Sequence, residues 1–204
     1  MSLYDLLLAG LPLFYFMFIA SITPGPNNVM LTASGMNFGY LRTLPHIAGI
    51  VSGFQVLILL CAFGMGSIYQ AFPQIEIVLK ALGAAYLLYL AYRIATAGRV
   101  GLKDRSKKAT RPLNFFEAFS FQFINPKGVV FSLAAISILP GGLTLLEICT
   151  IIFISTLINS IIATHTWTLF GKMIAALFRD DKIRHIINIV LAVLLLATIP
   201  MMVM

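Results

Sequence analysis

The sequence predicts an all-α polytopic membrane protein whose six transmembrane helices form two inverted three-helix repeats. Composition is the first observation behind this prediction, because 60% of the 204 residues are hydrophobic and only 10% are charged. A soluble domain usually has about 25% charged residues, so this chain has too few polar side chains to cover a surface in water. The second observation is a pair of proline-containing breaks, half a chain apart, that interrupt apolar segments.

Six apolar segments follow one another along the chain, and each has close to the ~20 residues that a membrane-spanning helix needs. In order, they cover residues 6–38, 45–66, 72–95, 115–139, 145–170 and 183–204. Residues 24–26 break the first segment, and residues 125–126 break the fourth. We therefore expect one transmembrane domain over residues 1–204, with repeat halves at about 1–98 and 112–204. Within the second segment, the spacing of Gly49 and Gly53 predicts close packing against another helix.

Lysine and arginine are concentrated in alternate connections between the segments. Eleven of them lie in the first, third and fifth connections: Arg42, Arg99, Lys103, Arg105, Lys107, Lys108, Arg111, Lys172, Arg179, Lys182 and Arg184. The second and fourth connections and both termini have none. Basic loops face the cytoplasm, so we expect the long basic loop there and both termini on the opposite side. Three spans per half then give the halves opposite orientations, as in the inverted repeats of many carriers.

The two breaks are the strongest indication of a binding site. Proline removes a backbone donor and ends or kinks a helix, and broken helices at corresponding positions of two halves mark the binding sites of carriers. Thr23 precedes Pro24 and Asn125 precedes Pro126. Because Thr and Asn are N-cap residues and proline suits the first helical position, we expect a new half-helix to begin at each break.

Nine residues make up the predicted substrate-binding site: Thr23, Pro24, Gly25, Pro26, Asn27, Asn28, Asn125, Pro126 and Lys127. A helix N-terminus presents unpaired N–H groups and the positive end of the helix dipole. Two such N-termini together with Lys127 favour a carboxylate, and the amide side chains add neutral donors and acceptors. No acidic residue lies near the breaks in the sequence, so a cationic side chain would find no counter-charge. A small zwitterion is the guest that we predict.

Two less specific interpretations of these residues stay open. Prolines also kink membrane helices for packing alone, and this could explain either break. Lys127 could extend toward the membrane surface or pair locally, although a lysine this deep costs about 2.5–3.5 kcal/mol on insertion scales, which favours a functional role. The sequence assigns no role to the remaining polar side chains of the apolar segments, among them His46, Gln55, Gln122, Asn159 and His165.

Composition also bears on cofactors and partners. The net charge is +7, but the basic residues lie mostly between apolar segments, so we expect the lipid bilayer and not nucleic acid as the partner. Cys61 and Cys149 form no CxxC pair and no Cys/His ligand pattern, so we expect no metal site. No nucleotide-binding P-loop is present, and we expect no cofactor. The sequence leaves a homodimer open.

Four stretches spread over nearly the whole chain match a known pattern. They are residues 21–28 (SITPGPNN), 44–49 (LPHIAG), 79–91 (LKALGAAYLLYLA) and 121–127 (FQFINPK). Together they resemble the LysE superfamily of amino-acid exporters, in its homoserine/threonine-exporter (RhtB) branch. Residues 188–196 (NIVLAVLLL) look more like the cysteine/O-acetylserine exporters. The last segment lacks the glycines that are common in many relatives.

The resemblance implies a six-span secondary exporter of small neutral amino acids or their derivatives in the bacterial inner membrane. It also implies exchange with protons as the driving force and no enzymatic activity. In the inner membrane, the distribution of basic residues then predicts that both termini lie in the periplasm. Two other classes fit the residues less well. A membrane thiol–disulfide reductase would use Cys61 and Cys149, which lie among Leu, Ile and Ala away from the breaks, where inert packing is the simpler role. A passive channel is the third class.

Overall fold

A computed structural model describes residues 3–65, 73–97 and 111–200, and within these ranges all regular structure is helical. This confirms the all-α class that composition and hydropathy predict. The helices are α1 (Leu3–Ile22), α2 (Pro26–Phe38), α3 (Tyr40–Leu60), the short π-helical turn η1 (Cys61–Met65), α5 (Pro73–Thr96), α6 (Phe115–Ile124), α7 (Pro126–Ile138), α8 (Leu145–Leu177) and α9 (Asp181–Leu196).

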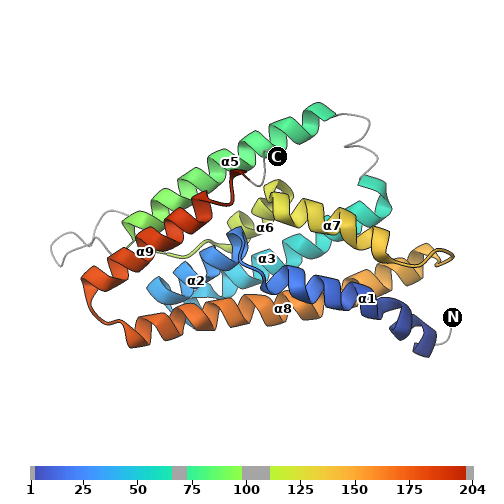
Figure 1. The fold of residues 1–204 in the computed structure, drawn as a ribbon, viewed down its shortest axis with the longest axis horizontal. Coiled ribbons are helices and arrows are strands. Elements are labelled where there is room, and N and C mark those ends of the chain that lie inside the picture. The colour runs from blue at the N-terminus through green and yellow to red at the C-terminus, as the bar shows by residue number, and fades with distance from the viewer. Residues whose placement is uncertain (1–2, 66–72, 98–110, 201–204) are drawn as a thin grey trace.

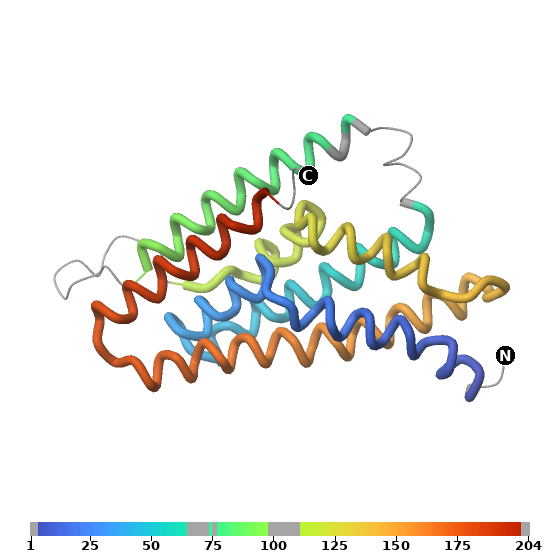
Figure 2. Tube along the Cα trace, in the orientation of Figure 1, coloured from blue at the N-terminus to red at the C-terminus, as the bar shows by residue number. Residues whose placement is uncertain are grey.

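The long helix α8 lies along the whole bundle, and α1 and α2 follow one another beside it (Figure 1). α3 packs against α8 on another side and against α6, while α5 and α9 form a pair (Figure 1). The ends of α2, α5 and α8 and the starts of α3 and α9 meet at the left end of the bundle (Figure 2). The start of α1 and the turn between α7 and α8 lie at the right end (Figure 2).

Charge and apolar surface are distributed as a membrane protein requires. Large apolar side chains cover the outside of the bundle, and several on different helices are more than half exposed, including Leu7, Ile19, Leu88, Ile154 and Val193. The left end in Figure 2 is basic, because arginines lie near the helix ends that meet there: Arg42, Arg93, Arg111, Arg179 and Arg184. A lipid-facing belt with one basic end is the pattern of a multi-pass membrane protein.

Four described helical segments are long and apolar enough to cross a membrane: Tyr4–Ile22, Tyr40–Gly64, Ile77–Thr96 and Leu145–Leu177. The bent pair α6 and α7 makes a fifth candidate, with an angle of 62° between its two helices. The segment predicted at residues 183–204 is not among these candidates. Its described helix, α9, has 16 residues, fewer than the ~20 that a span needs. The sixth span and the inverted repeats therefore stay predictions.

The predicted end of the fifth span is wrong, because α8 continues to Leu177 and contains Lys172. Lys172 therefore belongs to a helix and not to a connection. α8 continues through Gly171, and the backbone of α2 approaches α8 at this residue. A Cβ at Gly171 would collide with the carbonyl oxygen of Thr32, and a Cβ at Gly35 would collide with that of Thr168. Small residues bring the α2 and α8 backbones into contact at both points.

Glycines also allow close packing of α3 against α6, as the spacing of Gly49 and Gly53 predicts. A Cβ at Gly49 would collide with the carbonyl oxygen of Phe115, and one at Gly53 would approach that of Phe119 to 2.6 Å. Replacing either glycine by a larger residue would therefore push the two helices apart. The close approach of α3 to α6 also brings Gln122, which lies three residues before Asn125, against Gly53, where a Cβ would lie 2.9 Å from Gln122 Cγ.

Candidate functional site

The first break is a short extended segment between α1 and α2. The backbone N–H and the hydroxyl of Thr23 both donate to the carbonyl oxygen of Ile19, so Thr23 belongs to the last turn of α1. Gly25 has an extended backbone (φ −171°, ψ 178°) and is the N-cap residue of α2, and Pro26 is its first residue. The prediction of Thr23 as the N-cap is wrong. A residue before proline avoids the helical conformation, so Pro26 places the cap at Gly25.

The second break is a single residue between α6 and α7. Asn125 occupies the N-cap position of α7 with an extended backbone (φ −82°, ψ 108°), and Pro126 is the first helical residue. The predicted position of this cap is therefore confirmed, but the Asn125 side chain makes no capping hydrogen bond. Its Oδ1 atom is buried and has no hydrogen-bond partner. This oxygen is thus free to bind a ligand.

Lys127, in the first turn of α7, connects the second break to the first. Its Nζ donates a hydrogen bond of 2.7 Å to the carbonyl oxygen of Thr23 and lies 3.5 Å from that of Pro24. The aliphatic part of the lysine passes over Gly25, where a Cβ would lie 2.7 Å from Lys127 Cδ. The lysine therefore contacts the carbonyl end of α1, which is the negative end of that helix dipole. The sequence analysis predicted two positive helix N-termini at this site, and it did not predict the negative end of α1 beside Lys127.

Two asparagines of α2 complete the junction. Asn28 donates hydrogen bonds of 2.8 Å to the carbonyl oxygens of both Ser21 and Thr23, so its amide nitrogen caps the end of α1. Asn27 exchanges hydrogen bonds with Gln122 of α6, at 2.8 Å and 3.2 Å. This reciprocal amide pair gives Gln122 a structural partner that the sequence could not assign.

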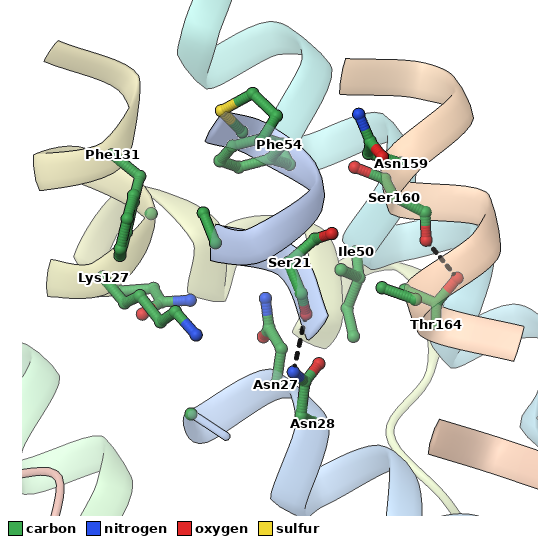
Figure 3. A pocket seen from close by; sticks show the side chains of 16 residues that line it. Ser21, Asn27, Asn28, Ile50, Phe54, Lys127, Phe131, Asn159, Ser160 and Thr164 are labelled. Atoms are coloured by element: carbon green, nitrogen blue, oxygen red, sulfur yellow. Dashed lines mark hydrogen bonds between the residues drawn. The ribbon is translucent and has the colours of Figure 1, made fainter. Parts of the chain in front are cut away.

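A cavity of about 80 Å³ lies between the two breaks and α8 (Figure 3). A single water needs about 10–15 Å³ on this scale, so the cavity has room for a small molecule. Five of the nine predicted residues line it: Gly25, Asn27, Asn28, Asn125 and Lys127. The other four lie at the two breaks but do not line the cavity: Thr23, Pro24, Pro26 and Pro126.

Residues that the sequence analysis did not place in the site form the opposite wall. They are Ser21 at the end of α1 and Asn159, Ser160 and Thr164 on α8, which Figure 3 shows across the cavity from Lys127. Their positions in the sequence carry a weak signal, because polar residues inside an apolar span seldom face lipid. The apolar part of the lining comes from small and aromatic side chains such as Ala20, Ala163, Phe54 and Phe131.

Asn159 presents a second free oxygen to this region. Its Nδ2 donates to the carbonyl oxygens of Phe14 and Ser155, at 3.1 Å and 2.9 Å. A carbonyl oxygen only accepts hydrogen bonds, so these two bonds determine which end of the amide is the nitrogen. Asn159 Oδ1 is buried and has no partner, like Asn125 Oδ1. A buried acceptor without a donor costs about 1–3 kcal/mol, which a donor group on a ligand would remove.

The charges around the cavity are those of a host for a zwitterion. Lys127 is the charged residue among the described lining residues, and none of them is acidic. Within the helical ladders, Val29 N–H bonds Gly25 O and Val129 N–H bonds Asn125 O, each at 3.0 Å. The N–H groups earlier in each first turn therefore lie outside the ladders. Cationic donors and helix N-termini suit a carboxylate, and the two amide oxygens suit an ammonium group.

The cysteines lie elsewhere. Cys61 is buried and Cys149 is half-buried, both are free, and neither lines this cavity. Nothing in the part of the chain that the structure describes supports a thiol–disulfide exchange site. In the same part, no group of three His, Cys, Asp or Glu side chains could hold a metal ion.

Comparison with known proteins identifies relatives. The LysE type translocator family matches residues 18–198. A cysteine/O-acetylserine efflux protein of Salmonella paratyphi A is 33% identical over 179 residues, which cover 87% of this chain and 88% of the relative. The protein of the same name in Escherichia coli O1:K1 is 31% identical over the same shares of the two chains. No solved structure matches.

Proposed function

Because the chain belongs to the LysE type translocator family, we propose that it exports a small neutral amino acid or amino-acid derivative across the bacterial inner membrane. Its relatives named cysteine/O-acetylserine efflux proteins favour substrates of that kind, and homoserine or threonine is the alternative. One observation supports the proposal most: a single cavity has Lys127 on one side and the unpaired amide oxygens of Asn125 and Asn159 among its other polar groups.

The substrate carboxylate binds at the second break. Lys127 Nζ lies beside the start of α7, and the N–H groups of Lys127 and Gly128 precede the first bond of the α7 ladder. A carboxylate here receives charge-assisted hydrogen bonds, which are about twice as strong as neutral ones. Lys127 would then divide its donors between the ligand and Thr23 O, since an ammonium group has three.

The substrate ammonium group binds the two free oxygens. Asn125 Oδ1 and Asn159 Oδ1 accept from it, and this satisfies two buried acceptors that have no hydrogen-bond partner within the protein. The small apolar wall next to them takes the side chain, and its size selects against large residues. A second positive charge on the side chain would find no carboxylate among the described lining residues, which favours neutral amino acids over lysine or arginine.

Transport follows from the position of the cavity between two broken segments. We place the breaks in corresponding spans of two inverted three-helix repeats within one domain of six spans, with both termini in the periplasm and with protons as the exchanged ion. Half-helices that meet at a midplane site and move against each other are a common means of alternating access in carriers. The bond from Lys127 to Thr23 O crosses between these repeats, so it is placed to respond when they move.

Inverted membrane vesicles test this function. Radiolabelled O-acetyl-L-serine, L-cysteine, L-homoserine, L-threonine and L-lysine are offered with and without an acid-inside proton gradient. We expect accumulation of one or more neutral amino acids that a protonophore abolishes, and no accumulation of lysine. Asn125→Ala should weaken the apparent affinity about tenfold, because it removes an acceptor for a charged donor. Competition by an N-acetylated analogue, which has no ammonium group, should not change in this variant. Two outcomes would contradict the proposal. Lysine could accumulate as much as the neutral amino acids, or no amino acid could accumulate above the level in vesicles without the protein.

A further inference from the structure

A second cavity, of about 40 Å³, lies at the basic end of the bundle. It lies among the end of α2, the start of α3, the end of α5 and residues 111–113. Its polar lining consists of Ser34, Asn37, His46, Arg93 and Arg111, and no acidic residue is among the described lining residues. The proposed substrate site uses none of these side chains.

The two cavities lie along the same faces of two helices. On α2, Asn27 lines the first cavity, and Met30, Ser34 and Asn37 line the second, at steps of 3, 4 and 3 residues. Such spacing places side chains on one helix face. On α3, Ile50 lines the first cavity and His46, one turn earlier, lines the second. The second cavity is therefore the next space toward the basic end.

His46 presents an unused donor in this cavity. The residue is fully buried, and Ser34 Oγ lies 3.1 Å from its Nδ1. Among the described residues, that contact is the one hydrogen bond of the Ser34 hydroxyl. The hydroxyl proton of Ser34 forms a hydrogen bond only if the hydroxyl donates to Nδ1. The neutral imidazole ring of His46 then has its proton on Nε2. Nε2 is buried and has no partner. A buried N–H needs an acceptor, and an anion in this cavity would supply one.

The charged residues around His46 are Arg93 and Arg111, which line the cavity, and Glu117, whose carboxylate also acts on His46 electrostatically. Arg111 is already paired, since its two terminal nitrogens contact the Glu117 carboxylate at 2.7 Å and 2.9 Å. Arg93 donates a hydrogen bond of 3.2 Å to the carbonyl oxygen of Arg111 and lies over the ring of Tyr89. No described carboxylate forms an ion pair with Arg93. The Glu117 carboxylate is bound by Arg111, so Arg93 and His46 keep donors for an anion, and no acidic residue is among the described residues that line the cavity.

We propose that this cavity is an inner binding site for the carboxylate of the exported amino acid, on the way from the basic end to the cavity between the breaks. The inference rests on the proposed function, because the anion it names is the substrate of that site. Arg93 binds the carboxylate by charge, and His46 Nε2–H donates the hydrogen bond that orients it. The substrate then moves along α2 and α3, past Met30 and Ile50, to reach Asn27 and Lys127.

Thiol labelling in inverted vesicles tests the inner site. In a chain with Cys61→Ser and Cys149→Ser, Ala97→Cys places a thiol on the second cavity, and Ser21→Cys places a matched thiol on the first. We expect the Ala97→Cys thiol to react faster with anionic sulfonatoethyl methanethiosulfonate than with its cationic trimethylammonium counterpart. O-acetyl-L-serine should slow the anionic reaction, and its methyl ester, which has no carboxylate, should not.

Three variants separate a loss of binding from a general disturbance of the structure. Arg93→Gln should abolish the preference for the anionic reagent, and His46→Phe should raise the protecting concentration about tenfold, the loss expected for a charged hydrogen bond. His46→Gln keeps an N–H donor and should restore most of the protection. Protection at Ser21→Cys without protection at Ala97→Cys would overturn the inner site while leaving the proposed function intact. Protection at neither position would overturn the proposed function, and the inner site with it.

Discussion

Lys127 Nζ donates a hydrogen bond of 2.7 Å to the carbonyl oxygen of Thr23, which lies 104 residues earlier in the chain. This bond joins the start of α7 to the end of α1 and brings both breaks to one cavity. It also gives Lys127 an anchor in the absence of substrate. An anchored ammonium group is held near its ligand position, so less conformational entropy is lost when the ligand binds.

Lys127→Met should therefore weaken substrate binding by about tenfold or more, because a charged hydrogen bond contributes roughly 1.5–3 kcal/mol. Insertion into the membrane should not suffer, since the methionine side chain is apolar. The measurement is the concentration dependence of O-acetyl-L-serine transport in vesicles, with the protein level determined in parallel. A normal rate with unchanged apparent affinity would remove Lys127 from the site and leave only the backbone of the breaks.

Gly25→Ala should displace Lys127 without disturbing the backbone. The extended φ of Gly25 (−171°) suits any residue, so the substitution causes no conformational strain. The new Cβ would lie 2.7 Å from Lys127 Cδ and 3.0 Å from Nζ, and the lysine must move away. We expect a several-fold loss of apparent affinity at normal expression. Gly141→Ala is the matched control, because a Cβ there meets nothing within 4 Å.

The coupling of these two changes makes the prediction sharper. In a Lys127→Met background the alanine at position 25 has no ammonium group to displace, so the double variant should lose less than the sum of the two single losses. Additive losses would show that Gly25 acts through the backbone and not through Lys127.

The breaks could be predicted from the sequence because proline acts locally. Pro26 and Pro126 each begin a helix in the structure, as their fixed φ and missing N–H require. The position of the α2 N-cap depends on Pro26 as well as on Pro24, and the prediction of Thr23 as the N-cap was wrong. The position of Lys127 in the first turn of α7 was likewise predictable, but its contact with Thr23 O was not, since the contact depends on how the two halves pack.

The wall of the cavity on α8 shows the same limit. Asn159, Ser160 and Thr164 lie in one continuous apolar segment with no break to mark them. Their place opposite Lys127 follows from the packing of α2 against α8, where Gly35 and Gly171 remove the side chains that would keep the backbones apart. A close contact of this kind depends on a partner far away in the sequence, and local patterns do not contain it.

Cys61→Ser with Cys149→Ser should leave transport close to normal. Neither cysteine lines the first or the second cavity, and both are free. The cost is limited to the burial of one hydroxyl at Cys61, about 1–3 kcal/mol of stability if it finds no partner. Transport assays and thermal unfolding of the doubly substituted protein measure the two effects. Complete loss of transport with normal folding would revive a thiol-dependent mechanism.

Reporter fusions test the orientation of the chain. A reporter that is active only in the periplasm should be active when fused after residue 204 and silent when inserted near residue 107. The reason is the excess of lysine and arginine in alternate connections, which the cytoplasm retains. Activity near residue 107 and silence after residue 204 would reverse the orientation and place the basic end outside.

Asn28→Ala should act through α1 and not through direct loss of a ligand contact. Its Nδ2 donates to the carbonyl oxygens of Ser21 and Thr23, and alanine leaves the end of α1 with fewer donors. We expect a lower midpoint of thermal unfolding, equivalent to about 1–2 kcal/mol for the lost capping bonds, together with weaker transport.

Asn28 and Lys127 both donate to the carbonyl oxygen of Thr23, so their effects must interact. In the double variant Asn28→Ala/Lys127→Met this oxygen loses both side-chain donors, and the unfolding midpoint should fall by more than the sum of the single changes, since either donor alone partly satisfies it. Thr43, whose hydroxyl donates to the carbonyl oxygen of Gly39 near the start of α3, away from the breaks, supplies the control. Thr43→Ala should add independently to Lys127→Met. Strict additivity of Asn28→Ala and Lys127→Met would mean that Thr23 O is not a shared acceptor in the folded protein.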